Sequence, residues 1–97
     1  MIYTQFDRDA FCEAFHKVFD STEILNLEAA CQGHKRVGDF YLYYDEDTFY
    51  IINLDKGVIV QYYKHLGRCN SVNDNINYTD LINFLSELKE AIRDENI

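Results

Sequence analysis

The chain has 97 residues, of which 47% are hydrophobic and 15% aromatic, enough for one domain, residues 1–97, with a single modest core. Seventeen acidic residues against nine Lys and Arg give a net charge of −8. That charge repels the phosphates of nucleic acids and of anionic membranes, so we expect no direct binding to either. No run approaches the ~20 apolar residues that span a bilayer, and three cysteines without paired spacing fit a reducing compartment. We therefore expect a cytoplasmic protein with free thiols.

The N-terminal third of the chain shows helical periodicity. Apolar residues recur at helical spacing over residues 7–19, and Asp7 is placed to cap that helix. A second helical segment is expected over residues 21–32, with Gly33 as its C-terminal stop.

Aromatic and β-branched residues then replace the helical pattern. The predicted strands are residues 37–44, 49–54 and 58–63. Residues 45–48 suit a four-residue hairpin loop, and residues 55–57 suit a three-residue turn in which Gly57 takes a positive φ. Both faces of these strands carry apolar or aromatic side chains, so we expect one face to pack on helices and the other to be partly exposed or covered by a partner.

The C-terminal third begins with a polar stretch, residues 67–77, which predicts a loop. A final helix follows, capped by Asn77 or Thr79. Its apolar stripe is Leu81, Leu85, Leu88 and Ile92. The predicted fold class is therefore α+β: a three-stranded antiparallel β-meander packed against two N-terminal helical segments and one C-terminal helix.

Histidine and cysteine spacings raise the question of a metal site. Cys12 with His16, and Cys31 with His34, are spaced so that the members of each pair could face one zinc ion. However, both cysteines fall beside apolar stripes, where a thiol acts as a small hydrophobic group. A chain with this many large apolar residues also needs no metal to fold. We expect neither a metal nor a cofactor.

Catalytic signatures are missing from the sequence. It contains no phosphate-binding glycine loop, no HExxH and no GxSxG. His65 lies near Cys69, but nothing around them matches a nucleophile motif. Asp45 and Asp47 lack the further ligands of a calcium loop. We do not expect an enzyme.

Binding of another protein remains, and the acidic triplet at residues 45–47, set among tyrosines, is its best candidate site. Carboxylates beside rigid aromatic rings are typical of surfaces that meet Arg and Lys. The predicted partner-binding residues are Asp39, Tyr43, Tyr44, Asp45, Glu46, Asp47, Tyr50 and Asp55. The plainer alternative is a solvated hairpin tip on a small sheet. Lys64, His65 and Arg68 would either neutralise nearby acids or bind an acidic patch of a partner.

Small size, acidic charge, many tyrosines, a sheet within residues 37–63 and a helix over residues 80–94 together resemble anti-CRISPR and other anti-restriction proteins of phages and mobile elements. The resemblance implies a protein that occupies the DNA- or PAM-reading groove of a type II CRISPR effector nuclease by mimicking nucleic-acid charge. It rests on no diagnostic motif, so no residue role is carried over. The rival hypotheses are an antitoxin or immunity-like protein that neutralises a basic toxin, and a phage or plasmid accessory protein with a structural role.

Overall fold

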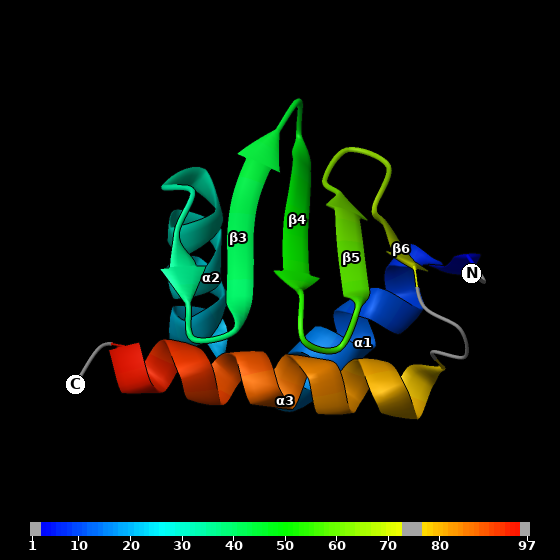
Figure 1. Ribbon diagram of the computed structural model, residues 1–97. Coiled ribbons are helices and arrows are strands. Elements are labelled where there is room, and N and C mark those ends of the chain that lie inside the picture. The colour runs from blue at the N-terminus through cyan, green and yellow to red at the C-terminus, as the bar shows by residue number, and fades with distance from the viewer. Residues whose placement is uncertain (1–2, 73–76, 96–97) are drawn as a thin grey trace.

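The computed structural model describes residues 3–72 and 77–95, which form one α+β unit (Figure 1). The elements in chain order are β1 (Tyr3–Phe6), α1 (Arg8–Val18), α2 (Ser21–Gln32), β2 (Arg36–Val37), β3 (Phe40–Asp45), β4 (Thr48–Asn53), β5 (Val58–Tyr63), β6 (Arg68–Val72) and α3 (Tyr78–Glu95). The α+β class expected from the sequence is confirmed.

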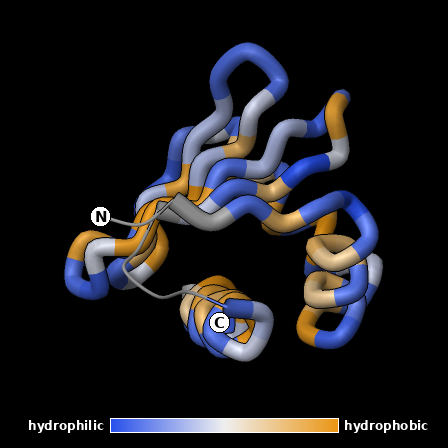
Figure 2. Tube along the Cα trace, turned by 90° about the vertical axis from the view of Figure 1, so that its right-hand side faces the viewer, coloured by the Kyte–Doolittle hydropathy of each residue, from blue (hydrophilic) through white to orange (hydrophobic). Residues whose placement is uncertain are grey.

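The described strands form one sheet in the order β1-β6-β5-β4-β3-β2, and every neighbouring pair is antiparallel. The predicted three-stranded sheet is therefore wrong in extent. Strands β3, β4 and β5 lie near the three predicted runs, but β6 and β1 extend the sheet on one side and β2 on the other. The three helices of the described chain lie on one side of this sheet (Figure 2).

Strand β6 lies within the stretch that was predicted to be a loop. Its polar residues gave no strand signal, yet Cys69 and Ser71 are fully buried because they point from β6 toward the helices. β6 pairs with β5 on one side and with β1 on the other. Such pairing supplies backbone hydrogen bonds and burial that outweigh weak intrinsic strand preference.

The turns also differ from the sequence-based expectation. Asp45 pairs with Thr48, so Glu46 and Asp47 alone form the β3–β4 turn, in place of a four-residue loop. At the other end, Asn53 pairs with Val58, and the turn spans residues 54–57. Gly57 there has φ +66, as predicted.

Side-chain caps fix the start of each helix. The backbone N–H of Ala10 donates to the Asp7 carboxylate at 2.8 Å, which confirms the predicted N-cap of α1. Asn77, the first of the two predicted residues, caps α3: its side chain accepts from the Asp80 N–H at 2.9 Å. α2 ends at Gly33, but Gly33 has φ −82, and the left-handed position belongs to His34 at φ 51.

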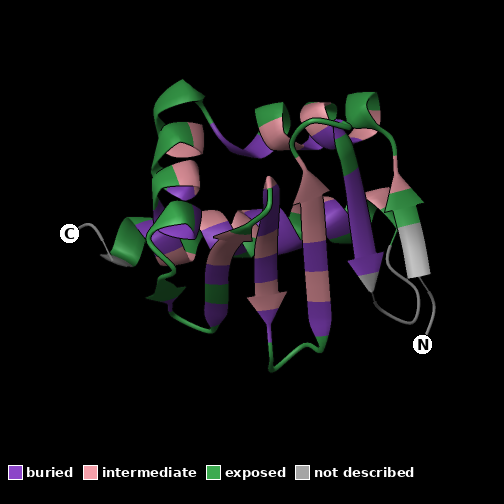
Figure 3. Ribbon diagram, turned by 90° about the horizontal axis from the view of Figure 1, so that it is seen from above, coloured by how far each residue is buried: buried purple, intermediate pink, exposed green. Residues whose placement is uncertain are grey.

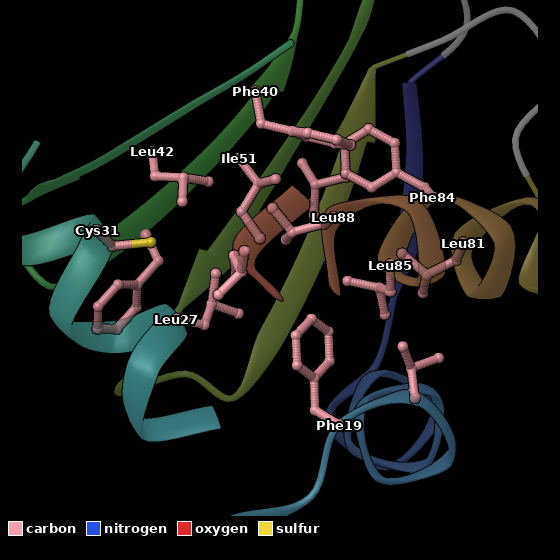
Figure 4. Close-up of a cluster of buried hydrophobic side chains, with 14 of the residues drawn as sticks. Phe19, Leu27, Cys31, Phe40, Leu42, Ile51, Leu81, Phe84, Leu85 and Leu88 are labelled. Atoms are coloured by element: carbon pink, nitrogen blue, oxygen red, sulfur yellow. The ribbon is translucent and has the colours of Figure 1, made fainter. Parts of the chain in front are cut away.

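The core lies between the helices and the sheet face that they cover. Leu42 and Ile51 of the sheet and Leu85 and Leu88 of α3 belong to this one core cluster, and all four are at most 1% exposed (Figure 4). Burial of this apolar area is the main favourable term in folding. The helices leave the opposite side of the sheet uncovered within the described chain, and this side is called the open face below.

Alternation along the strands decides which residues reach each face. Figure 3 shows buried and half-buried residues alternating along the central strands. On β4, Phe49 and Ile51 are buried beneath the helices, whereas Tyr50 and Ile52 are half-buried on the open face. The prediction of one packed face and one partly exposed face is confirmed for the described residues.

Candidate protein-binding surface

The open face is unusually aromatic for an uncovered sheet surface. Pairing register places the following side chains on it: Tyr41, Tyr43, Tyr50, Ile52, Ile59, Gln61 and Tyr63. Tyr43 and Tyr50 are direct cross-strand partners, and their rings stack with centroids 4.4 Å apart and planes 3° from parallel. The Tyr63 hydroxyl donates to Gln61 Oε1 at 2.9 Å. The stacked rings are rigid, amphipathic groups that can contact a partner at low entropic cost.

Two carboxylates lie at the end of this face that is formed by the β3–β4 turn, beside the stacked rings. Asp45 ends β3 and Glu46 begins the turn, and both are exposed. Burial raises the pKa of Tyr50, and the neighbouring Tyr43 and the carboxylates of Asp45 and Glu46 raise it further. Among the described residues, no hydrogen bond or ion pair involves either carboxylate. Both are therefore available to a partner.

Asp47 has a different role, because its carboxylate binds Tyr44 and His65 and so stabilises the turn. The Tyr44 hydroxyl donates to Asp47 Oδ1 at 2.5 Å, and His65 Nε2 lies 2.8 Å from Oδ2. The Tyr44 hydrogen bond lowers the pKa of Asp47, and the charges of His65 and Lys64 act in the same direction. The backbone N–H of Lys64 also donates to the Asp47 carbonyl at 3.0 Å. Lys64 and His65 of the basic loop thus lie beside the acidic residue Asp47.

Tyr44 does not belong to the open face. It follows Tyr43 on β3 and therefore points to the side of the helices, where its ring packs against Phe49 with centroids 4.9 Å apart. The structure thus separates Tyr44 from Tyr43 and Tyr50, although all three were predicted to belong to one site.

Asp39 and Asp55 lie at the opposite end of the sheet from the acidic turn. Asp39 directly precedes β3 and Asp45 ends it, so the two residues are about 20 Å apart along the strand. The two residues line a groove of about 560 Å³ beside α3. The other charged residues of this groove are Lys56, Glu87, Glu90 and Asp94. Lys56 Nζ lies 3.1 Å from the Glu87 carboxylate. Among the described residues that line the groove, five are acidic and one, Lys56, is basic.

The predicted set of site residues is therefore divided between two acidic regions with an aromatic surface between them. Sequence reasoning missed Tyr41, Tyr63 and the three α3 carboxylates of the groove. The alternation within residues 58–63 placed Tyr63 on the face of Gln61, but nothing local showed which face the helices would cover. The helix α3 carboxylates have the spacing of an ordinary solvated face, and only its packing against the end of the sheet brings them to Asp39 and Asp55.

Three of the four residues considered as zinc ligands lie close together in the fold. Cys12, His16 and Cys31 line one pocket between α1 and α2, but His34 lies elsewhere, 3.2 Å by its Nε2 from the Tyr44 carbonyl. Within residues 3–72 and 77–95, no three His, Cys, Asp or Glu side chains are grouped so that they could hold a metal ion. The three cysteines are unpaired, and burial raises the pKa of Cys31 to about 12.

Comparisons of the chain with models of protein families, with curated proteins and with solved structures found no match. In the described part of the chain, no helix has both the length and the apolar character needed to cross a membrane.

Proposed function

We propose that this chain binds a basic, nucleic-acid-handling protein and inhibits it by occupying the groove that normally holds nucleic acid. In its most specific form, the proposal is an anti-CRISPR protein that blocks DNA or PAM binding by a type II CRISPR effector. The net charge of −8 and the two separate acidic regions support a partner with a positively charged groove.

The single observation that carries the proposal is the conformation of Glu46. This residue has φ 46 in a two-residue hairpin turn, where Asn, Asp and Gly are the favoured types. A left-handed conformation costs a residue such as Glu roughly 1–2 kcal/mol. Asp47, also left-handed at φ 65, is held by Tyr44 and His65, but no described hydrogen bond or ion pair involves the Glu46 carboxylate. A strained, exposed carboxylate without an internal role supports a role in binding.

The surface beside Glu46 matches the chemistry of an arginine-rich groove. A guanidinium group can pair with the Asp45 or Glu46 carboxylate and at the same time stack on the tyrosine rings of the open face. Buried Tyr and Arg contacts dominate the energy of many interfaces. Tyr43 and Tyr50, which are already stacked on each other, would offer such a ring surface without further ordering.

DNA cleavage by purified type II effector–guide complexes tests the proposal. The chain is added before or after a linear DNA that carries the PAM and the target. We expect inhibition only when the chain is added first, because prebound DNA already fills the groove. The double variant Asp45→Asn with Glu46→Gln should inhibit at least tenfold less well, since removing one partner of a buried carboxylate–arginine pair costs on the order of 2–5 kcal/mol, much of it from the charge left unpaired.

A matched control is the double variant Asp9→Asn with Glu13→Gln on α1. It also removes two of the seventeen acidic residues, and both positions are exposed. The control should inhibit like the parent chain. Equal loss in both variants would show that net charge alone matters, which contradicts a defined site at the turn. If no effector in a broad panel is inhibited, the anti-CRISPR form fails, and rescue of cells from basic toxins becomes the test of the antitoxin alternative.

A further inference from the structure

A pocket on the helix-covered side of the sheet has no role in the proposed protein binding. α1 packs mainly against α3, whereas α2 packs mainly against β3, so the two helices diverge over the centre of the sheet. Between them a pocket of about 220 Å³ remains. Leu27, Cys31 and Ile51, three of its lining residues, are labelled in Figure 4.

Aromatic side chains from three elements surround the pocket. They are Phe11 and Phe15 of α1, Phe49 of β4 and Tyr62 of β5. Phe11 and Tyr62 are nearly parallel, with centroids 4.6 Å apart, and Phe11 meets Phe15 edge-on at 4.4 Å. A further aromatic ring could join this cluster in stacked or edge-on geometry.

The volume of the pocket limits the size of a ligand. An apolar protein cavity of about 150 Å³ accommodates benzene. A pocket of about 220 Å³ therefore suits a fused two-ring system, or one ring with a short side chain. A larger polycyclic molecule or a long acyl chain would not be enclosed.

The charge of the residues that line the pocket indicates which of these aromatic molecules would bind best. Of the described residues that line the pocket, Glu28 is the only acidic one, and it is half-buried. No ion pair in the described chain uses its carboxylate. Burial is the main reason that the pKa values of Cys31 and Tyr62 are raised, and the Glu28 charge raises both further, while Arg8 acts against it at Tyr62. A positively charged group near Glu28 would relieve this unpaired charge.

We propose that the pocket binds a small aromatic amine, with its ring among Phe11, Phe15, Phe49 and Tyr62 and its ammonium group beside Glu28. This site goes beyond the proposed inhibitor function and does not depend on it. The pocket lies on the opposite side of the sheet from Tyr43 and Tyr50, so variants in the pocket leave the proposed protein-binding surface unchanged.

Tryptamine is a suitable probe, because the chain contains no tryptophan and indole emission therefore comes from the probe alone. Titration with the whole chain should shift tryptamine emission to shorter wavelength and raise its anisotropy. Affinity should fall in the order tryptamine, indole, indole-3-acetate, because Glu28 attracts the amine and repels the carboxylate. Unchanged emission at millimolar protein would overturn the site, and equal affinity for tryptamine and indole-3-acetate would overturn the choice of an amine.

Glu28→Gln tests the rim directly. It should weaken tryptamine binding about two- to fivefold, as expected for a partly exposed ion pair, and leave indole binding unchanged. Glu13→Gln, an exposed Glu on α1 outside the pocket lining, serves as the matched control and should change neither. A similar loss in both variants would contradict the assignment of Glu28.

Alkylation of Cys12 gives a second measurement that needs no variant. Cys12 lines the pocket and is partly exposed, whereas Cys31 and Cys69 are buried and burial raises the pKa of both thiols. Iodoacetamide should therefore modify Cys12 first, as followed by mass spectrometry of peptides. Saturating tryptamine should slow this reaction several-fold. An unchanged rate at Cys12 would place the bound probe outside this pocket and overturn the proposal.

Discussion

Two neighbouring isoleucines of β4 illustrate the difference between the faces of the sheet. Ile51 is 1% exposed and contributes to the core beneath the helices, whereas Ile52 is half-buried on the open face. The tyrosines divide in the same way. Tyr62 packs on Phe11 of α1, whereas Tyr43 stacks on Tyr50 and meets the exposed His34 edge-on. Identical residue types therefore stabilise the core on one face and form a partly exposed surface on the other.

The largest expected effect compares these two isoleucines. Ile51→Ala should lower the free energy of unfolding by about 2–5 kcal/mol, because it removes buried methyl groups and leaves a cavity. Ile52→Ala should cost about 1 kcal/mol, because solvent already reaches the side chain. Urea denaturation of both variants measures the difference. Equal losses would show that the open face is covered in solution, for example by a second copy of the chain.

The stacked tyrosine pair on the open face can be measured by a double-mutant cycle. Tyr43→Ala and Tyr50→Ala should each destabilise the protein modestly, with a coupling energy of about 0.5–1.5 kcal/mol from the aromatic contact. Both single variants should also weaken inhibition of the partner. A coupling energy near zero would mean that the two rings are not stacked in solution, and the open face would then lack the rigid surface on which the proposal depends.

A smaller effect is expected at the turn, and it should have opposite signs for stability and binding. Glu46→Asn should raise the free energy of unfolding by roughly 0.5–1 kcal/mol, because Asn tolerates the left-handed conformation better than Glu. The same variant should inhibit less well, since it loses a carboxylate. Asp45→Asn, on an extended residue, is the control and should leave the urea midpoint unchanged. A Glu46→Asn variant that inhibits as well as the parent would remove the main support for the function.

The smallest effect is a pH dependence at Asp47. The Tyr44 hydrogen bond lowers the pKa of this carboxyl group in the folded protein. Its stabilising contribution is therefore complete above the ordinary carboxyl pKa of about 3.9 and is lost as pH falls through the lower folded value. Asp47→Asn should melt at a lower temperature than the parent near pH 6, and the two curves should converge toward pH 2. Asp45→Asn should follow the parent throughout; a persistent gap for Asp47→Asn at pH 2 would contradict this origin.

Local features explain which elements could be predicted from the sequence. Asp7 and Asn77 begin their helices because their side chains reach backbone N–H groups three residues later, and this interaction needs only the local chain. The β3–β4–β5 meander was recognisable because alternation and short turns act over a few residues. β1 and β6 were missed because each owes its strand conformation to pairing with a segment that its own residues do not reveal.

The candidate site shows the same division. The sequence by itself determined that the protein is acidic and tyrosine-rich and that residues 45–47 bring negative charge to a hairpin end. Only the tertiary structure decided that Asp47 lies against Tyr44 and His65, that Tyr44 faces the helices, and that Asp39 and Asp55 join the carboxylates of α3 in a separate groove. The physical reason is that charge and amphipathic character belong to each residue, whereas exposure and pairing depend on which distant segments the core brings together.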